Sequence, residues 1–386
     1  MMGRDQLRPS DSKTPAASKI LVIGAGVAGC SFAIRLRQRG IDVDLVEKEA
    51  FPRAKVCGCC LGPTGIEQLQ ELDLLDSVMS RSVTTNRWRA SLGGRHLDLK
   101  IPAGIAVSRE ILDPMMVEAA QKTGARVRMQ CSAVVESADD ATVHVRLEQN
   151  GERTIETYDC VVVASGLRAG NLKGMLPWIE QPHGPFGVSF MASSSDVEPG
   201  TIYMACDADG YVGLVQLEGG QVDVAAALVS GSTGASSGDP LHRVGQILAN
   251  SVFASLRLGD LTPLMATPPL RRTRVAGLGR VIAIGDAAGY VEPFTGEGMT
   301  WAMQGGIAAA DLVARNHYDL KHIGEEWCNY IDVSVKRRKT ICRVMTAMLR
   351  SPVACRVAAT TLSVFPSLAR PLLSTAQSKA EVRKRG

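Results

Sequence analysis

The chain has 386 residues, of which 45% are hydrophobic and 21% charged, with 38 glycines and a net charge of +4. This composition allows two or more domains or one large discontinuous fold, and it excludes a small disulfide-stapled scaffold and a largely disordered chain. Residues 1–18 are polar and lack the apolar run of a secretory signal, and the ten cysteines do not resemble a secreted disulfide framework. No uncharged apolar stretch reaches the ~18 residues of a spanning helix. We therefore expect a disordered tail over 1–18 and a cytoplasmic protein.

The first elements in chain order predict a βαβ unit. Ile20–Ile23 is a continuous apolar run, glycines follow it, an Ala- and Leu-spaced segment extends to Gln38, and Val43–Val46 is a second strand-like run. Further on, the spacing predicts a helix over Ile111–Lys122 and a strand over Arg126–Arg128, with β-rich sequence up to Val163.

A second kind of pattern begins near Gly170. Between about Gly170 and Thr273 short alternating runs separated by Gly and Ser favour an antiparallel sheet. An apolar strand then returns at Val281–Ile284, followed by a helical pattern over Gly298–Asn316. From Trp327 to about Leu373 the sequence is mainly helical and is broken by prolines at positions 352, 366 and 371.

Together these elements predict an α/β fold, in which a Rossmann-like dinucleotide-binding domain carries an inserted antiparallel-sheet substrate domain and a helical C-terminal segment. The domain ranges that we expect are 19–85, 105–168 and 274–316 for the discontinuous dinucleotide-binding domain, 86–104 and 169–273 for the β-rich domain, and 317–386 for the basic helical segment.

The C-terminal segment is strongly basic. From Lys336 onward there are 12 lysines and arginines against one acid, Glu381. Apolar residues recur in it at helical spacing, namely Ile341, Val344, Met345, Met348 and Leu349. A membrane leaflet, an acidic protein or nucleic acid would each complement this charge, and a solvated helical face with a frayed tail explains it equally. We expect peripheral contact at the inner face of the membrane and no nucleic-acid partner.

Gly24, Gly26 and Gly29 form a GxGxxG motif directly after the first strand and at the start of the helix. In this context the first glycine makes the turn, the second lets the backbone approach a pyrophosphate, and the third lets helix and strand pack closely. Glu47 ends the second strand, where a carboxylate accepts hydrogen bonds from ribose hydroxyls and repels a 2′-phosphate. The unit therefore predicts FAD or NAD rather than NADP.

A second motif lies in VIAIGDAAGYVEPFTGEG, residues 281–298, where a strand ends in Gly285 and Asp286. Together with ILVIGAGVAG at residues 20–29 and KVCG at 55–58, this motif resembles the geranylgeranyl reductase group of flavoproteins. That group shares its fold with flavin-dependent aromatic hydroxylases, halogenases and electron-transfer flavoprotein dehydrogenases. The resemblance runs from Lys19 to about Asn316 and is weakest in the inserted sheet.

The resemblance implies FAD as cofactor and assigns several residues to it. Asp286 would hold the ribityl chain, and the backbone from Pro293 through Gly296 and Gly298 to Met299 would line the isoalloxazine ring. A helix beginning at Gly298 would direct free backbone donors to the ring edge where negative charge develops on reduction. Arg109 stands where relatives place an arginine on the pyrophosphate; otherwise it is an ordinary surface charge.

The cysteine motif departs from the family. Relatives have KxCGGG, whereas this chain has KVCGCC, so Cys57 matches the family's cysteine and Cys59 and Cys60 replace small residues near the flavin. These thiols are candidate catalytic or redox-active groups, or they are small packing residues. No second CxxC or His pair accompanies them, so we expect no metal site.

Two other departures concern the electron donor and the substrate. Ser165-Gly166 stands where relatives carry an Asp-Gly pair linked to nicotinamide use, so the electron donor is either NAD(P)H or a protein carrier. The halogenase WxWxIP signature is absent, which argues against halogenation, and the prenyl-reductase YxWxFP-like motif is degraded to the residues from Tyr211 to Gln216.

The function that these observations favour is an FAD-dependent oxidoreductase that reduces or dehydrogenates C=C bonds in a lipophilic isoprenoid, lipid or polyketide-like substrate. The alternatives are a flavin monooxygenase of an aromatic or polyketide substrate, and a flavin redox sensor or electron-transfer module. Residues that either wall an apolar substrate cavity or form plain sheet core are Met191, Tyr203, Met204, Tyr211 and Leu214.

Overall fold

The computed structural model describes residues 18–168, 170–172, 174–180, 184–230, 238–290, 297–349 and 351–364. Almost all of the expected tail over 1–18 therefore lies outside the described residues, as do Pro293 and Gly296 and the chain from residue 365 onward.

The first unit is built on a six-stranded sheet with the strand order β18-β19-β10-β1-β2-β6. All its pairs are parallel except β18–β19. The strands β1, β2, β10 and β19 are buried along their whole length, which explains the continuous apolar runs of β1, β10 and β19. The strands of this sheet are β1 (Ile20–Ile23), β2 (Asp44–Glu47), β6 (Arg126–Met129), β10 (Cys160–Val163), β18 (Gly277–Leu278) and β19 (Val281–Ala283).

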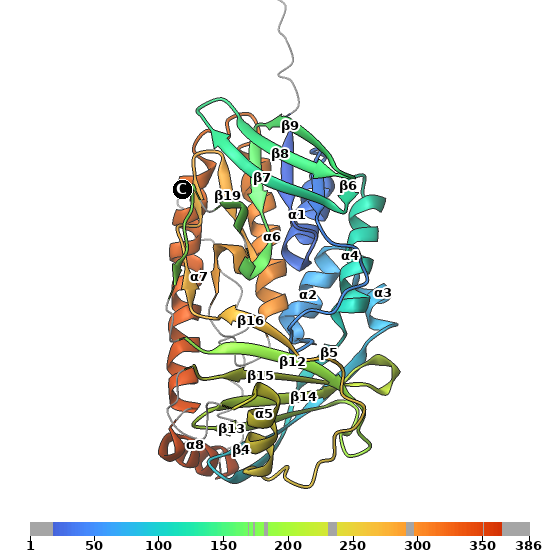
Figure 1. The fold of residues 1–386 in the computed structure, drawn as a ribbon, viewed down its shortest axis with the longest axis vertical. Helices are drawn as coiled ribbons and strands as arrows, with labels where there is room; N and C mark the ends of the chain where they lie inside the picture. Colours follow the sequence, from blue (N-terminus) through green and yellow to red (C-terminus); the bar gives the residue numbers. More distant parts are fainter. Residues whose placement is uncertain are drawn as a thin grey trace, which may run out of the picture.

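Three helices pack around this sheet. Helix α1 (Val27–Gln38) contacts both α4 (Arg109–Lys122) and α6 (Gly298–Arg315), and Figure 1 shows α1 and α6 side by side. A Cβ atom at Gly306 would lie 2.4 Å from the carbonyl oxygen of Ala28, so only glycine lets the two helix backbones approach this closely. This contact joins the beginning of the chain to residues almost 300 positions later. The short helices α2 (Pro63–Glu71) and α3 (Leu75–Met79) connect this unit to the next sheet.

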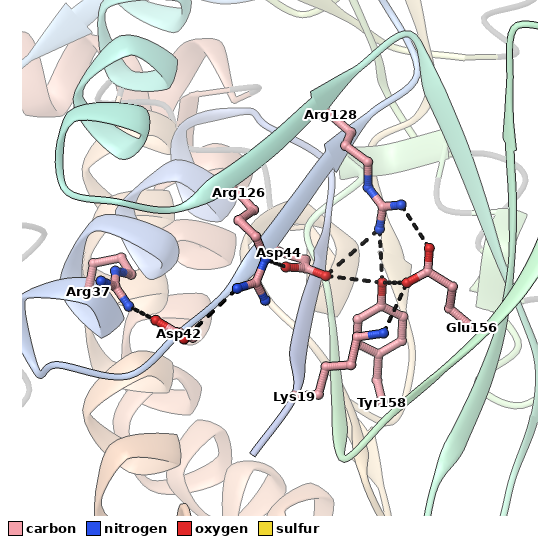
Figure 2. A network of polar contacts seen from close by, with 8 residues as sticks. All are labelled: Lys19, Arg37, Asp42, Asp44, Arg126, Arg128, Glu156 and Tyr158. Atoms are coloured by element: carbon pink, nitrogen blue, oxygen red, sulfur yellow. Dashed lines mark hydrogen bonds and ion pairs between the residues drawn. The ribbon is translucent and has the colours of Figure 1, made fainter. Parts of the chain in front are cut away.

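A three-stranded antiparallel sheet of β7 (Cys131–Ala138), β8 (Val143–Gln149) and β9 (Glu152–Tyr158) lies against the first unit. Figure 2 shows the polar network that ties it there. Arg126 contacts the nearly buried Asp44 at 2.6 Å, and Arg128 contacts Glu156 at 2.8 Å. The hydrogen bond from Arg128 holds the pKa of Glu156 at about 2, so this network stays ionised at neutral pH. Because it joins strands of the two sheets to each other, we assign it a structural role.

The second unit is an eight-stranded sheet with the order β16-β12-β15-β14-β13-β4-β5-β3. It is mainly antiparallel, but β13 pairs in parallel with β4, which precedes it by more than 100 residues. Its strands are β3 (Cys60–Leu61), β4 (Val83–Leu92), β5 (Arg95–Ala106), β12 (Phe186–Ala192), β13 (Thr201–Asp207), β14 (Gly210–Gln216), β15 (Val222–Leu228) and β16 (Met265–Pro269). The expected α/β fold with an antiparallel substrate sheet is confirmed. Strand β3 belongs to this sheet, although its residues fall in the range 19–85 that we expected for the dinucleotide-binding domain.

The two faces of the large sheet have different neighbours. One face packs against α5 (Pro240–Ala249) and includes Tyr203 and Leu214. The other face places Met204 and Tyr211 with the C-terminal helices and Met191 with the cysteine loop. The five residues for which the sequence left open a cavity wall or plain sheet core therefore do not share a face, since neighbours in a strand point to opposite sides. Apart from Met191, they are sheet core.

The C-terminal segment forms α7 (Ile323–Leu349), a long helix along one edge of the molecule, and α8 (Pro352–Val364) at the far end of the large sheet (Figure 1). Met345 and Leu349 pack with α8 against β4 and β5. A third small sheet comprises β11 (Ile179–Glu180), β17 (Arg272–Thr273) and β20 (Gly289–Tyr290). Within the described ranges, no helix has both the length and the apolar character to cross a bilayer.

Candidate functional site

The three glycines of the first motif have different surroundings. A Cβ at Gly24, where φ is +108°, would lie 2.7 Å from the oxygen of Ala164, and one at Gly29 would lie 1.9 Å from the oxygen of Gly24. A Cβ at Gly26 would instead meet only Arg109 Nη2 and Lys55 Nζ, each at 3.8 Å. Gly24 and Gly29 are therefore required by the fold, whereas Gly26 leaves a space that faces two cations.

The end of β2 and the start of α1 complete this part of the site. Glu47 Oε2 accepts from the backbone N–H of Ala25 at 2.9 Å, and Oε1 accepts from that of Glu49 at 3.0 Å. Both oxygens keep lone pairs for ribose hydroxyls. The N-cap of α1 is Gly26, and no side chain caps the helix. Its first backbone donors and its positive dipole end therefore remain available to an anion.

Asp113 fixes the two cations over Gly26. Arg109, at the start of α4, donates to the two oxygens of Asp113 at 2.8 and 2.9 Å, and Lys55 Nζ lies 2.6 Å from the same carboxylate. Asp113 is completely buried, and although burial alone would raise its pKa, the charges of Arg109 and Lys55 hold that pKa below its usual value. Two cations and one anion leave a net positive charge at the glycine turn. Arg109 thus faces the glycine turn and is paired with a buried carboxylate, which is not the geometry of an ordinary surface charge.

The second motif, which contains Gly285 and Asp286, lies next to α1 and close to Arg109. Gly285 has φ of +57°, and a Cβ there would lie 2.8 Å from the Cβ of Ala28, so the strand end is pressed against α1. Asp286 follows in a 3-10 turn, Gly285–Ala288. Burial raises the pKa of Asp286 to about 6, against the opposing charge of Arg109 and in the same sense as Cys57. Asp286, Arg109 and Cys57 thus form one electrostatic cluster, although the sequence separates Asp286 from Cys57 by 229 positions.

Helix α6 begins at Gly298, as the sequence predicted, and its N-cap residue Glu297 makes no side-chain capping bond. Met299, in the first turn, is buried. The first backbone donors of α6 are therefore uncapped in the way that those of α1 are. Pro293 and Gly296, the other residues expected in this motif, lie outside the described residues.

The cysteine loop lies between these two motifs and the large sheet. Cys60 pairs with Ala106 of β5, and Cys59 is buried with φ of +50°, a conformation that favours glycine. The backbone N–H of Cys59 points to the Cys57 sulfur at 3.4 Å. A hydrogen bond from the Cys59 side chain, aided by Arg109, lowers the pKa of Cys57 to about 6, although burial opposes this. Of the three thiols only Cys57 has a lowered pKa, because a hydrogen bond to Cys57 together with burial raises the pKa of Cys59, and burial raises that of Cys60.

Sequence reasoning missed two residues that organise the site. In the sequence, Lys55 is only the first residue of the KVCG run, and Asp113 is only one position in a predicted helix. The i,i+4 spacing of Arg109 and Asp113 was the available signal, since this spacing brings two side chains together on a helix. What no local pattern shows is that Lys55, from a different loop, reaches the same carboxylate.

The site fits a dinucleotide. It offers a carboxylate for a ribose, a cationic glycine turn for a pyrophosphate, a second carboxyl for a polyhydroxyl chain, and an uncapped helix end for a ring that becomes negative. FAD contains all four parts, and NAD lacks the polyhydroxyl chain.

The pH dependence of FAD binding tests the role of Asp286. The ionised carboxylate accepts more hydrogen bonds than the protonated acid, so binding should be strongest above the pKa of about 6 and weaken as pH falls through it. Below that pKa the affinity should fall by up to about tenfold per pH unit, since one proton is linked to binding. Calorimetric titration with FAD from pH 5 to 8 measures this. Asp286→Asn should bind weakly at every pH and lose the slope; an unchanged slope would refute the assignment.

Comparisons with known proteins agree with this geometry. Residues 17–173 match the family described as FAD binding domain. Menaquinone reductase of Mycobacterium tuberculosis is 24% identical over 364 residues, covering 87% of this chain and 85% of that protein. Digeranylgeranylglycerophospholipid reductase 2 of Methanopyrus kandleri is 24% identical over 76% of each chain. Conditioned medium factor receptor 1 of Dictyostelium discoideum is 25% identical over 78% of this chain but only 65% of its own length.

Solved structures share the fold over nearly the whole chain. The flavin-dependent brominase Bmp2 superposes with a TM-score of 0.78 at 16% identity, covering 94% of both chains. A geranylgeranyl bacteriochlorophyll reductase-like protein from Thermoplasma acidophilum gives a TM-score of 0.75 at 17% identity, covering 95% of this chain and 97% of that one. At these identities the likeness shows the architecture alone.

Proposed function

Because the chain is an FAD-dependent oxidoreductase with distant homology to isoprenoid reductases, we propose that it saturates C=C bonds in a polyisoprenoid lipid. The observation that carries this proposal is the position of the cysteine loop. It places a low-pKa thiol between the FAD motifs and an apolar cluster on the large sheet that includes Met191, Ile202 and Val215. An apolar substrate and a protein proton donor are what saturation of an isolated double bond requires.

The geometry supports an assignment of the residues that would hold FAD. Glu47 would accept from the adenosine ribose, and Gly26 with the N-terminus of α1 would receive the pyrophosphate. Arg109 and Lys55, both fixed by Asp113, would neutralise the phosphates. Asp286 would take the ribityl hydroxyls, and the α6 terminus from Gly298 to Met299 would line the ring. When bound, FAD supplies the hydride chemistry.

The protein's own groups orient the reaction and exclude water from it. The cysteine loop, residues 57–60, packs against β5 and the large sheet, so apolar side chains lie beside its thiols. The Cys57 sulfur is the group placed to exchange a proton with a reacting carbon, since it alone among the three thiols has a lowered pKa. The electrons would come from NAD(P)H or from a protein carrier.

The direct test is a product assay with the FAD-loaded protein. We would photoreduce the holoenzyme in the absence of oxygen, add menaquinone or a digeranylgeranyl glycerophospholipid, and analyse the lipid by mass spectrometry. The proposal predicts a gain of two hydrogens for each double bond reduced. A gain of oxygen in the aerobic reaction would instead identify a monooxygenase.

We also propose that the C-terminal helices contact a lipid surface, which gives access to such a substrate. Four large apolar side chains near the end of α7 and on α8 are exposed, and they lie beside the exposed Arg343 and Arg356. These apolar side chains are Val344, Met348, Val353 and Val357. Exposed valines flanked by arginines suit the boundary between anionic headgroups and acyl chains.

Flotation with anionic phosphatidylglycerol liposomes measures this contact. Val353→Glu with Val357→Glu should reduce the bound fraction at least about tenfold, because each buried valine contributes about 1.5–3 kcal/mol. The matched control is Val275→Glu, which alters a valine that is similarly exposed elsewhere on the molecule, at 59% against 69% for Val353 and 61% for Val357. Equal flotation of wild type and the double variant would contradict this part of the proposal.

A further inference from the structure

A carboxyl group that the FAD site does not use is buried in the large sheet. Asp223 lies in β15, where it pairs with Met191 of β12 and Val215 of β14, and it is only 2% exposed. Both neighbours belong to the apolar cluster that contains Cys59 and packs against Cys57 and Cys60. Asp223 therefore enters the cysteine cluster from the sheet side, opposite the FAD motifs.

Asp223 has no cation to stabilise its charge. Among the described residues it forms no ion pair, and the titratable groups that face it are the three thiols and Glu110. Its contact is a hydrogen bond with the Cys59 side chain. Burial raises the pKa of Asp223 well above its usual value, and the negative charge of Cys57 acts in the same direction, so both effects favour the protonated carboxyl.

Cys59 connects this acid to Cys57. Its side chain hydrogen-bonds to Asp223 on one side and to Cys57 on the other. It does so from a backbone with φ of +50°, where a side chain is strained and glycine is favoured. Beyond Cys57 the next group is Arg109, whose positive charge stabilises a thiolate. The order of groups is thus acid, thiol, thiolate and guanidinium.

We propose that Asp223, Cys59 and Cys57 form a proton-delivery line to the substrate, a role that rests on the proposed reduction of C=C bonds. The Cys57 thiolate first takes the proton of Cys59, and Cys59 takes the proton of Asp223, which becomes a carboxylate. Cys57 would then give the proton it received to one alkene carbon and return to the thiolate, while FAD, when bound and reduced, would supply the hydride for the other carbon. Solvent later returns one proton to Asp223. Cys57 and Cys59 end the cycle unchanged, and no thiol is oxidised.

Turnover as a function of pH tests this line, with reduced holoenzyme and a digeranylgeranyl glycerophospholipid as probe. Asp223→Asn should lower the rate of substrate saturation roughly 10²-fold, the usual effect of losing a general acid, while the KM for the lipid stays within about twofold. Wild-type activity should fall as pH rises through the raised pKa of Asp223, and this limb should vanish in Asp223→Asn. Asp223→Glu should restore part of the rate, since it restores the acid.

A structural role for Asp223 would not produce that pattern. A matched control is Cys206→Ser, which alters a half-buried thiol on the same sheet beside the C-terminal helices, and it should leave the rate unchanged. Unchanged turnover and pH profile in Asp223→Asn would overturn the proposal.

Infrared spectroscopy separates this proposal from the proposed function. At neutral pH the wild type should show a carboxylic-acid C=O band that is absent in Asp223→Asn. If wild type reduces no isoprenoid probe, the proposed function fails, and the band alone then decides whether Asp223 stores a proton. Absence of the band would overturn the delivery line whatever the substrate.

Discussion

Gly26→Ala should weaken FAD binding strongly and leave the fold intact, whereas Gly29→Ala should unfold the chain. At Gly26 a Cβ meets only the ends of Arg109 and Lys55 at 3.8 Å, an ordinary contact, so the protein without cofactor keeps its packing. The added methyl group nevertheless occupies the space through which the pyrophosphate approaches the backbone. A Cβ atom at Gly29 would lie 1.9 Å from the Gly24 oxygen. This overlap can be relieved only if β1 and α1 move apart.

The two variants are compared by thermal unfolding monitored by circular dichroism and by FAD titration monitored by flavin fluorescence. We expect Gly26→Ala to unfold within a few degrees of wild type, with at least about 10²-fold weaker binding, equivalent to roughly 2.7 kcal/mol. Gly29→Ala should give little folded protein. If Gly26→Ala bound FAD normally, the glycine turn would not be the pyrophosphate site.

Asp113→Asn should destabilise the protein by about 3–5 kcal/mol, because it leaves Arg109 and Lys55 as buried cations without their counter-ion. The same change should weaken FAD binding, since the two cations are no longer fixed over Gly26. Urea unfolding of the protein without cofactor measures the first effect, and FAD titration measures the second.

Asp311→Asn is the matched control. Asp311 also pairs with two cations, Arg35 and Arg39, both at 2.9 Å, but these side chains are more exposed to solvent. Water screens such pairs, so the loss in the free energy of unfolding should stay below about 1 kcal/mol and FAD binding should not change. Equal losses in the two variants would show that burial at Asp113 has no energetic consequence.

The sequence was sufficient for the parts of the fold that depend on local pattern. Apolar runs identified the buried parallel strands, and the glycines of the two motifs predicted α1 and α6. At Gly24, Gly29 and Gly285 a Cβ atom would collide with a neighbouring element, which is why glycine stands there. The expected helix over Gly298–Asn316 became α6, Gly298–Arg315, and the helix over Ile111–Lys122 became α4, which begins two residues earlier at Arg109.

The arrangement of the large sheet could not be predicted in the same way. Tyr203 and Met204 are adjacent in β13, so they must point to opposite faces, and which face meets α5 is decided by strand pairing. The parallel pairing of β13 with β4 joins segments more than 100 residues apart. The residue pattern within β4 or β13 alone does not predict that the two strands pair.

The same reason explains the missed acids. Asp113 and Asp223 are single carboxylates in a helical and a strand pattern, where acids are normally placed toward solvent. Their roles come from partners on other elements, Lys55 for the first and Cys59 for the second. The candidate cysteines, in contrast, were visible because they replace glycines within a motif.

The measurement that tests the central claim most directly follows the flavin absorbance of the photoreduced holoenzyme after mixing with oxygen-free menaquinone or digeranylgeranyl lipid. A reductase should recover its oxidised absorbance at a rate that rises with lipid concentration, and the lipid should leave with added hydrogen. Absorbance that stays bleached with every lipid and returns only when oxygen is admitted would contradict the account.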